Sequence, residues 1–356
     1  MLKERSDNKI RAGLLGATGH VGRAAAETLI GMEKYDVHLG VRNTDKAEEM
    51  FQGKAAIHAV DIFDSRKLED FCRDCDIVIN CAGPSELIGD IVLKACIETG
   101  TFYVDPAGGQ RLIKLLSAQD SKLREKKLAA VSSAGVFPGL TEIVTRYAAE
   151  KYFDEALEAK LYFAGEGKLS FNAVADIGSE ITTGSVNGKR KEFIRDKFFY
   201  EISENRCGYE LDVAEFNRAC DELEMDKYRF YNTYPDIKFL NKLMEVAEYE
   251  EKNDSEGKKA RLAELQHFYE ERSDKELTFL RAEIKGYKDG IFTKKKTSFK
   301  AQKDWNVFTG IIAALTADHV LDSGSVGALR SDEAVQPQCF LNDLKKYGLS
   351  EIEVDT

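Results

Sequence analysis

The stretch that decides the fold runs from Arg11 to Gly22 and reads Arg-Ala-Gly-Leu-Leu-Gly-Ala-Thr-Gly-His-Val-Gly. A short apolar run leads directly into three glycines, and an Ala-rich helical pattern follows them. A strand, a glycine turn and a helix in this order are typical of a dinucleotide-binding site. Gly16 permits the tight turn, Gly19 lets the backbone approach a pyrophosphate, and Gly22 lets the helix pack closely on the strand. The amides at the start of that helix would face the phosphates.

The glycine spacing is GxxGxxG rather than GxGxxG, and this variant still supplies all three roles. An ordinary glycine-rich turn is the alternative, but the position between a first strand and a first helix favours cofactor binding. The turn residues that we predict to contact the cofactor are Gly16, Thr18, Gly19, His20, Val21 and Gly22.

The end of the second predicted strand, Val37–Val41, indicates which dinucleotide is bound. An acidic residue at this place would accept hydrogen bonds from a ribose with a free 2′-hydroxyl. The chain has Arg42 there, with Asn43 beside it. Because a guanidinium fits a 2′-phosphate, we predict NADP(H) as the cofactor, with Arg42 and Asn43 among its contacts.

Ligands of open α/β sheets lie at the carboxyl ends of the strands. The third predicted strand ends in Asp61, which we include among the cofactor contacts. The fourth ends in Asn80-Cys-Ala-Gly-Pro84, whose small side chains leave room for a ribose and a nicotinamide. A tight turn without a ligand is the alternative. The predicted contacts in this loop are Cys81, Ala82, Gly83 and Pro84.

Length and composition limit the classes of protein that fit. A chain of 356 residues is long enough for two domains with sizeable cores. The hydrophobic content is 43%, and no apolar run approaches the length of a membrane span, so we expect a soluble protein. The first residues have no apolar core of a secretion signal, which favours a cytoplasmic location. The net charge of −11 argues against nucleic acid as a partner.

The cysteines and histidines do not suggest a metal site or a disulfide framework. The seven cysteines are scattered and odd in number. Cys72 and Cys75 form one CxxC, which lacks a second pair and a nearby histidine. The five histidines show no spacing of metal ligands, so no metal is predicted.

The first part of the chain alternates strand and helix patterns, which predicts a parallel sheet with crossover helices. The predicted strands are Arg11–Leu15, Val37–Val41, Ala55–Val60, Asp76–Cys81, Thr101–Val104 and Leu128–Ser132. The fold class is therefore α/β, with a doubly wound parallel Rossmann domain and an α+β second domain that contains a mixed sheet.

The pattern changes at Pro138-Gly139, a turn signal, and longer strand patterns follow. An apolar, Ala-rich helical pattern returns at Trp305–Leu321, and the end of the chain reads as an irregular loop with one helix, Phe340–Tyr347. We therefore predict a Rossmann domain at residues 1–137 that is completed by 305–356. Residues 138–304 would form a domain for substrate binding and dimerisation.

Five motifs and a characteristic tail occur in order along the chain. They are Gly16-Ala-Thr-Gly-His-Val-Gly22, Gly40-Val-Arg-Asn43, Val78-Ile-Asn-Cys-Ala-Gly-Pro84, Tyr103-Val-Asp-Pro-Ala-Gly-Gly109, Gly135-Val-Phe-Pro-Gly139 and the segment that starts with Trp305. Together they resemble the saccharopine-dehydrogenase-like reductases, firmly over about the first 145 residues and the last 50.

The resemblance implies NADPH-dependent reduction of an imine or a thiazoline-like C=N bond in an amino-acid-derived substrate, either a small molecule or one tethered to a carrier. It also implies a homodimer. The second domain has no obvious pair of arginines for two carboxylates, which does not favour saccharopine itself.

Hydride transfer to an imine requires one group that keeps the nitrogen protonated. Our candidates are Asp105 at the end of the fifth predicted strand, and Asp176 and Tyr231 in the second domain. Asp176 lies in an apolar stretch, which could raise the pKa of its carboxyl, and Tyr231 lies in an aromatic cluster. Each could instead be a cap or a packing residue.

Two other functions remain open at this point. The enzyme could reduce a carbonyl or an enoyl C=C bond, or the chain could be a non-catalytic NADP-binding sensor or scaffold. A separate domain of about 160 residues argues for catalysis, because a sensor needs only the dinucleotide fold. The sequence does not name the substrate, the direction of the reaction or the oligomeric state.

Overall fold

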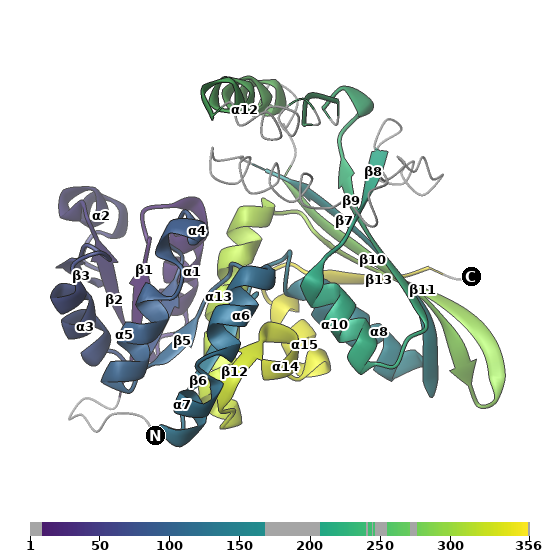
Figure 1. Ribbon diagram of the computed structural model, residues 1–356, viewed down its shortest axis with the longest axis horizontal. Helices are drawn as coiled ribbons and strands as arrows, with labels where there is room; N and C mark the ends of the chain where they lie inside the picture. The colour runs from purple at the N-terminus through teal and green to yellow at the C-terminus, as the bar shows by residue number, and fades with distance from the viewer. Residues whose placement is uncertain are drawn as a thin grey trace. The chain divides into compact units, whose positions relative to one another are not determined.

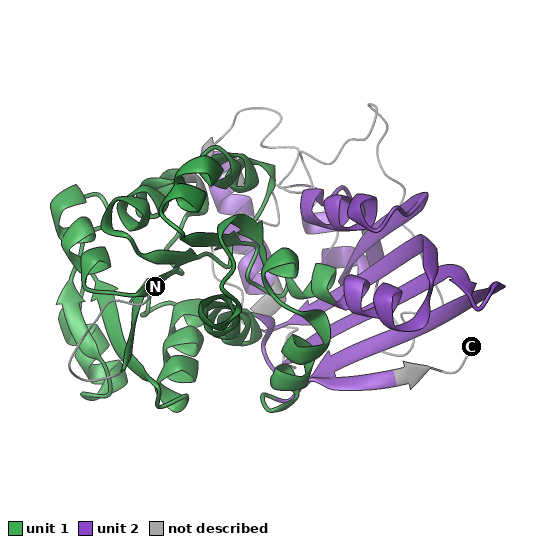
Figure 2. Ribbon diagram, turned by 90° about the horizontal axis from the view of Figure 1, so that it is seen from below, with its two compact units in different colours: residues 1–143, 306–347 green, residues 144–305, 348–356 purple. Residues whose placement is uncertain are grey.

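The computed structural model describes residues 9–167, 207–239, 241–243, 245, 255–270 and 276–354. The chain forms two compact units, which Figure 2 shows in different colours. Unit 1 contains Met1–Ile143 and Asn306–Tyr347, and unit 2 contains Val144–Trp305 and Gly348–Thr356. The return of the chain to the first unit thus ends at Tyr347 and not at residue 356, because the last strand pairs within unit 2.

Unit 1 is built on a seven-stranded sheet with the order β12-β6-β5-β4-β1-β2-β3 (Figure 1). All of its pairs are parallel. The strands are β1 (Ile10–Leu15), β2 (Tyr35–Val41), β3 (Ala56–Ala59), β4 (Ile77–Asn80), β5 (Phe102–Val104), β6 (Ala129–Ser132) and β12 (Gly327–Arg330). This confirms the doubly wound prediction. The strand order reverses between β1 and β4, so a ligand is expected at their carboxyl ends.

Helices cover this sheet. They are α1 (His20–Gly31), α2 (Thr44–Phe51), α3 (Ser65–Arg73), α4 (Ser85–Ile88), α5 (Ile91–Thr99), α6 (Gln110–Ser117), α7 (Asp120–Glu125), α13 (Trp305–Ser323), α14 (Ser331–Ala334) and α15 (Pro337–Lys345). Every residue of β4 and β6 is buried, as expected for a parallel sheet with both faces covered. Two separate helices, α6 and α7, lie between β5 and β6.

The returning segment is an integral part of unit 1. Helix α13 contacts α1 so closely that a Cβ atom added to Gly310 would lie 2.2 Å from the carbonyl oxygen of Val21. The Lys34 ammonium, in the turn after α1, lies 2.5 Å from Asp318 of α13. The seventh strand follows, with Gly327 opposite Ala129. The sequence had suggested an irregular loop here, because a strand of four residues carries no readable alternation.

We predict that Gly310→Ala destabilises unit 1. A methyl group would overlap the backbone of α1 and separate the two helices, with an expected cost of about 1–3 kcal/mol. The matched control is Gly31→Ala, at an exposed position with nothing within 4 Å, where the same change should stabilise by about 0.5–1 kcal/mol. Denaturant unfolding of both variants measures the difference. Equal effects of the two changes would contradict this packing.

Unit 2 contains a six-stranded mixed sheet with the order β13-β11-β10-β7-β9-β8, as the sequence predicted in kind. The strands are β7 (Glu155–Glu166), β8 (Cys207–Leu211), β9 (Lys227–Tyr234), β10 (Leu277–Lys288), β11 (Ile291–Ala301) and β13 (Ser350–Val354). The pair β7–β9 is parallel and the others are antiparallel. The described helices are α8 (Leu140–Tyr152), α10 (Ala214–Glu222) and α12 (Ser255–Glu270).

Two of these helices cover one face of the mixed sheet (Figure 1). Phe216 of α10 contacts Phe230 of β9, with ring centroids 5.5 Å apart. Tyr147 of α8 contacts Phe299 of β11, with centroids 5.8 Å apart. These aromatic pairs form the core of the unit on that face.

Candidate functional site

The glycine turn after β1 is held by contacts that only glycine permits. Gly16 has φ +78°, and a Cβ atom there would lie 2.5 Å from the carbonyl oxygen of Cys81. A Cβ atom on Gly22 would lie 2.3 Å from the carbonyl oxygen of Gly16. These two glycines are therefore explained by packing within the protein: one brings the turn against the loop after β4, and the other brings α1 against the turn.

Gly19 has no such internal reason. It is exposed, its φ of −86° suits any residue, and a Cβ atom would only reach ordinary contact at 3.4 Å from Gly16. It is the N-cap of α1, and no side chain caps the helix at this end. No acidic residue lies in the first turn, and His20 is exposed. The open amides of α1 and the bare backbone at Gly19 fit a pyrophosphate.

The loop after β4 lies directly against this turn. Cys81 donates its amide to the carbonyl of Leu15 at 3.0 Å, and a Cβ on Gly16 would lie 2.7 Å from the Ala82 nitrogen. Cys81 and Ala82 are half-buried, while Gly83 and Pro84 are exposed. Burial raises the pKa of the Cys81 thiol, so this cysteine stays protonated and is no nucleophile at neutral pH.

Arg42 follows β2 at the same edge and is exposed. Within the described part of the chain its side chain makes no ion pair or hydrogen bond, so its guanidinium is available to donate hydrogen bonds to a phosphate. Asn43 has a structural task, because its Oδ1 accepts from Lys46 at 3.0 Å and caps α2. Asp61 accepts from the Phe63 amide at 3.0 Å and shapes the turn after β3. Their contacts with the cofactor stay a prediction.

Asp105, which follows β5, is the centre of a buried network. Its Oδ2 accepts from the Tyr103 hydroxyl at 2.5 Å and from Nδ2 of Asn80 at 2.9 Å, and its Oδ1 accepts from the Ala107 amide at 2.8 Å. Only 4% of the residue is exposed. Burial raises the pKa of its carboxyl to about 6, while these three donors oppose the rise. The carboxylate is thus occupied by the protein.

Only one of the other two catalytic candidates, Asp176 and Tyr231, lies within the described residues. Asp176 lies outside them. Tyr231 is in the interior of β9; it is 2% exposed and stacks on Tyr162, with ring centroids 4.9 Å apart. The stretch around Tyr231 is a strand that pairs with β7, so its alternate residues face the two sides of the sheet.

The sheet face that carries Tyr231 also holds a residue that sequence reasoning missed. Arg281 of β10 is opposite Tyr162 in the strand register and is 3% exposed. Its Nε donates to Ser298 at 2.8 Å, and its guanidinium lies 5.7 Å from the Phe279 ring centroid. A single arginine in an alternating strand gives no signal in the sequence, because charged residues usually mark the solvent side.

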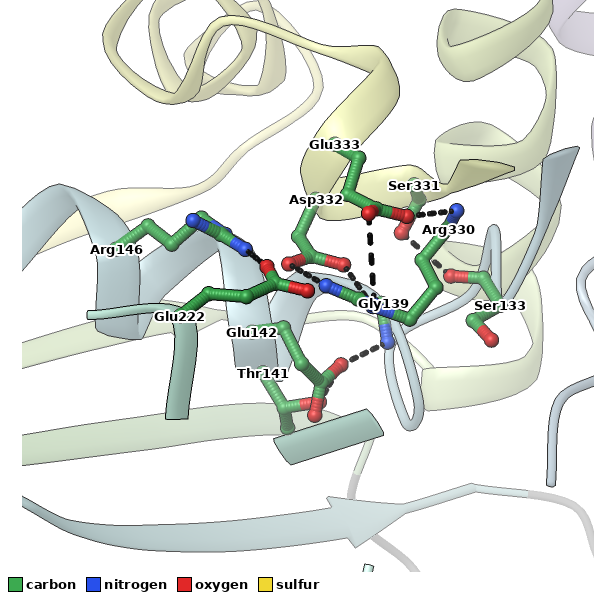
Figure 3. Close-up of polar contacts among 10 residues, drawn as sticks. All are labelled: Ser133, Gly139, Thr141, Glu142, Arg146, Glu222, Arg330, Ser331, Asp332 and Glu333. Carbon is green, nitrogen blue, oxygen red and sulfur yellow. Dashed lines mark hydrogen bonds and ion pairs between the residues drawn. The ribbon is translucent and has the colours of Figure 1, made fainter. Parts of the chain in front are cut away.

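A second polar network in unit 1 lies at the carboxyl ends of β6 and β12 (Figure 3). Arg330 and Asp332 form a buried ion pair with Nε 3.0 Å from Oδ1. Ser331 donates to the carbonyl of Ser133 at 2.6 Å, and Glu142 accepts from the Gly139 amide at 2.5 Å. The bond from Ser331 to Ser133 fastens the segment after β12 to the loop after β6. Arg330, Asp332 and Ser331 all have partners within the protein, which indicates a structural role for them.

Other predicted features can be placed as well. All seven cysteines are free thiols, and Cys72 and Cys75 are buried in the core of unit 1. Among the described residues, no three His, Cys, Asp or Glu side chains are grouped so that they could hold a metal ion. In the same part of the chain, no helix combines the length and the apolar character of a membrane span.

Comparisons with known proteins agree with the geometry of unit 1. Residues 12–134 match the saccharopine dehydrogenase NADP binding domain family. The chain is 34% identical over 76 residues to the saccharopine dehydrogenase-like oxidoreductase of Mus musculus. The matched segment is 21% of this chain and 18% of that protein. It is 29% identical over 157 residues to the carboxyaminopropylagmatine dehydrogenase of Synechocystis sp.. That matched segment is 40% of this chain and 38% of that protein.

The matched segments span less than two fifths of these curated relatives. The fold is shared over a greater length. The apo saccharopine dehydrogenase (L-Glu forming) of Saccharomyces cerevisiae is similar with a TM-score of 0.69 and 14% identity, over 97% of this chain and 100% of that chain. At this identity the likeness shows a common fold.

Proposed function

We propose that this chain is an NADPH-dependent oxidoreductase that reduces a C=N bond, because residues 12–134 match the saccharopine dehydrogenase NADP binding domain family. The observation that carries the proposal is the open N-terminus of α1 at Gly19, where neither the backbone nor neighbouring atoms require a glycine. An exposed arginine follows the adjacent strand β2. A dinucleotide with a 2′-phosphate requires both features.

In this proposal the residues of unit 1 bind and orient the dinucleotide. The first-turn amides of α1 hold the pyrophosphate and Arg42 holds the 2′-phosphate. The loop Cys81–Pro84 has small side chains beside Gly16, so it leaves room for the nicotinamide end. NADPH would supply the hydride when bound. Tyr231 and Asp176 are our candidates for the groups that orient the substrate or supply a proton.

An amino-acid-derived substrate is supported by two observations. The Synechocystis relative carries the name carboxyaminopropylagmatine dehydrogenase. In unit 2 the buried guanidinium of Arg281 lies on the sheet face that carries the stacked rings of Tyr162 and Tyr231. A buried arginine beside aromatic rings suits a carboxylate with an apolar neighbour. The substrate could be free or tethered to a carrier.

The proposal is tested by oxidation of NADPH with a panel of acceptors. Imines formed in solution from amines and 2-oxo acids, and thiazolines, are offered beside simple ketones and enoyl compounds. Turnover of the C=N compounds is expected. Turnover of ketones or enoyl compounds alone would replace the proposed bond with C=O or C=C. Tight NADPH binding without any turnover would favour a non-catalytic sensor.

We also propose that the chain forms a homodimer through unit 2. Apolar side chains are exposed where β10 and β11 are joined: Tyr287 is 39%, Ile291 69% and Phe292 56% exposed. Exposed apolar residues that lie together are typical of interaction sites. Light scattering over a range of concentrations measures the assembly. A monomer at every concentration contradicts this proposal.

A cytoplasmic location remains our proposal for the site of action. Its support is that none of the seven cysteines forms a disulfide, which is usual in a reducing compartment. Fractionation of cells that express the full chain would decide it.

A further inference from the structure

We propose that Asp105 is a positioning residue: through Asn80, its carboxylate holds the Cys81–Pro84 loop in place for the nicotinamide half of the dinucleotide. This inference rests on the proposed function, since it requires that the dinucleotide lies at this edge of the sheet. It differs from the sequence interpretation, in which Asp105 was itself a proton donor.

The link from the carboxylate to the loop is direct. Asn80 is the last residue of β4, and its side-chain amide has two tasks. Its Nδ2 donates to Asp105 at 2.9 Å, and its Oδ1 accepts from the Ala82 amide at 3.3 Å. Asp105 therefore fixes the orientation of the Asn80 amide, and that orientation decides whether Ala82 meets an acceptor or a donor.

The loop that is held in this way is the one that contacts the glycine turn. A Cβ atom on Gly16 would meet the Cys81 carbonyl at 2.5 Å and the Ala82 nitrogen at 2.7 Å. The two segments are therefore in direct backbone contact. A small rotation of the peptide at Ala82 would therefore change the position of Gly83 and Pro84, which are the exposed end of the loop.

Asp105 also joins two other loops at this edge. Its Oδ1 accepts from the Ala107 amide at 2.8 Å, and its carbonyl accepts from Ala134 at 3.0 Å. Ser133 in turn donates its amide to the carbonyl of Ala107 at 2.8 Å. The carboxylate of Asp105, a residue that is 4% exposed, thus joins the loops after β4 and β5, and the loop after β6 is bonded to the backbone of the same segment.

The network requires the ionised form of Asp105. The hydroxyl of Tyr103, the amide of Asn80 and the backbone of Ala107 all donate to its carboxylate. Protonation would turn one carboxylate oxygen into a hydroxyl donor that faces three other donors, and one of those three would then lose its acceptor. Because the carboxyl pKa is raised to about 6, the intact network is present above this pH and is lost as the pH falls through it.

The other titratable groups that face Asp105 do not change charge in this range. Tyr103 comes from β5 and Cys81 from the end of β4, and burial raises the pKa of both. Both are neutral near pH 6. A transition in this network at mildly acidic pH therefore belongs to Asp105.

The test compares two ligands by calorimetry: NADP⁺, and 2′-phospho-ADP-ribose, which has the same phosphates but no nicotinamide. The 2′-phosphate titrates near pH 6 in both, so the ratio of their affinities cancels it. In Asp105→Asn we expect NADP⁺ to bind about tenfold or more weakly, and the probe to change by less than about threefold. The control is Asp120→Asn, since Asp120 also accepts a backbone amide, that of Ala328 at 2.8 Å.

Two further results keep the inference testable if Asp105→Asn does not fold. In the unchanged protein the affinity for NADP⁺, relative to that for 2′-phospho-ADP-ribose, should decrease as the pH falls from about 7 to about 5. Tyr103→Phe removes a donor to the ionised carboxylate, raises its pKa and should move this midpoint to higher pH. A ratio that is constant with pH, or an equal loss for both ligands in Asp105→Asn, would overturn the inference. If the unchanged protein binds neither ligand, the proposed function fails instead.

Discussion

Replacing Gly19 by aspartate should abolish dinucleotide binding and at the same time stabilise the protein. Gly19 is the N-cap of α1, with extended backbone and no side-chain cap, and aspartate is among the best residues for this place. The gain in unfolding free energy should be about 0.5–1 kcal/mol, because the carboxylate caps the free amides and faces the positive end of the helix. The same carboxylate would occupy and repel the pyrophosphate, with a loss of NADPH affinity of at least about 100-fold.

The opposite signs of these two effects make the result specific. Gly31→Asp is the matched control, because it places the same charge at the exposed last residue of the same helix. There the carboxylate meets the negative end of the helix, so stability should fall slightly and NADPH binding should not change. Thermal unfolding and calorimetry measure both quantities. A Gly19→Asp variant that still binds NADPH tightly would show that the phosphates do not lie at α1.

The second large effect is expected at Arg42. Arg42→Ala should weaken NADPH by about 10- to 100-fold, because it removes a charge-assisted contact worth about 1.5–3 kcal/mol. The affinity for NADH, which has no 2′-phosphate, should stay the same. The unchanged protein should prefer NADPH by about tenfold or more.

Arg73→Ala is the control for this prediction. Arg73 ends α3 and pairs with Asp70 at 2.6 Å, so its removal changes the net charge equally without a role at the strand ends. Calorimetric titration of NADPH and NADH into both variants gives the comparison. Equal losses of affinity for NADPH and NADH in Arg42→Ala, or an unaltered preference for NADPH, would show that Arg42 does not bind the 2′-phosphate.

Unit 1 could be predicted from sequence because its signals are local. Gly16 and Gly22 mark one turn, and the buried strands read as short apolar runs between helical patterns. The predicted second strand, Val37–Val41, lies within Tyr35–Val41. The last parallel strand escaped prediction, since Gly327–Arg330 takes its place only by pairing with β6, far away in the chain.

Unit 2 was less readable because its pairings are distant. The ends of β7 are hard to read from the sequence because they are rich in charge. Glu158 lies opposite Lys285 of β10 in the strand register, with the two side chains 2.6 Å apart. The final strand, Ser350–Val354, joins unit 2 for the same reason, by pairing with β11.

The candidate site divides along the same line. The glycines and Arg42 are recognisable because a phosphate needs bare backbone and positive charge at fixed places in the chain. The roles of Asp105 and Arg281 depend on their neighbours in space, Asn80 and Tyr103 for the one and Tyr162 and Ser298 for the other. The spacing of residues in the sequence does not predict which side chains become neighbours in the fold.

The most direct test of the account is to follow the hydride itself. NADPH with deuterium at C4 of the nicotinamide, prepared separately for each face, is incubated with the protein and the C=N compounds that it turns over. Mass spectrometry of the product should find one deuterium on the former imine carbon, from one labelled form only, and none with Gly19→Asp. Product that lacks deuterium with both labelled forms would contradict NADPH-dependent reduction by this chain.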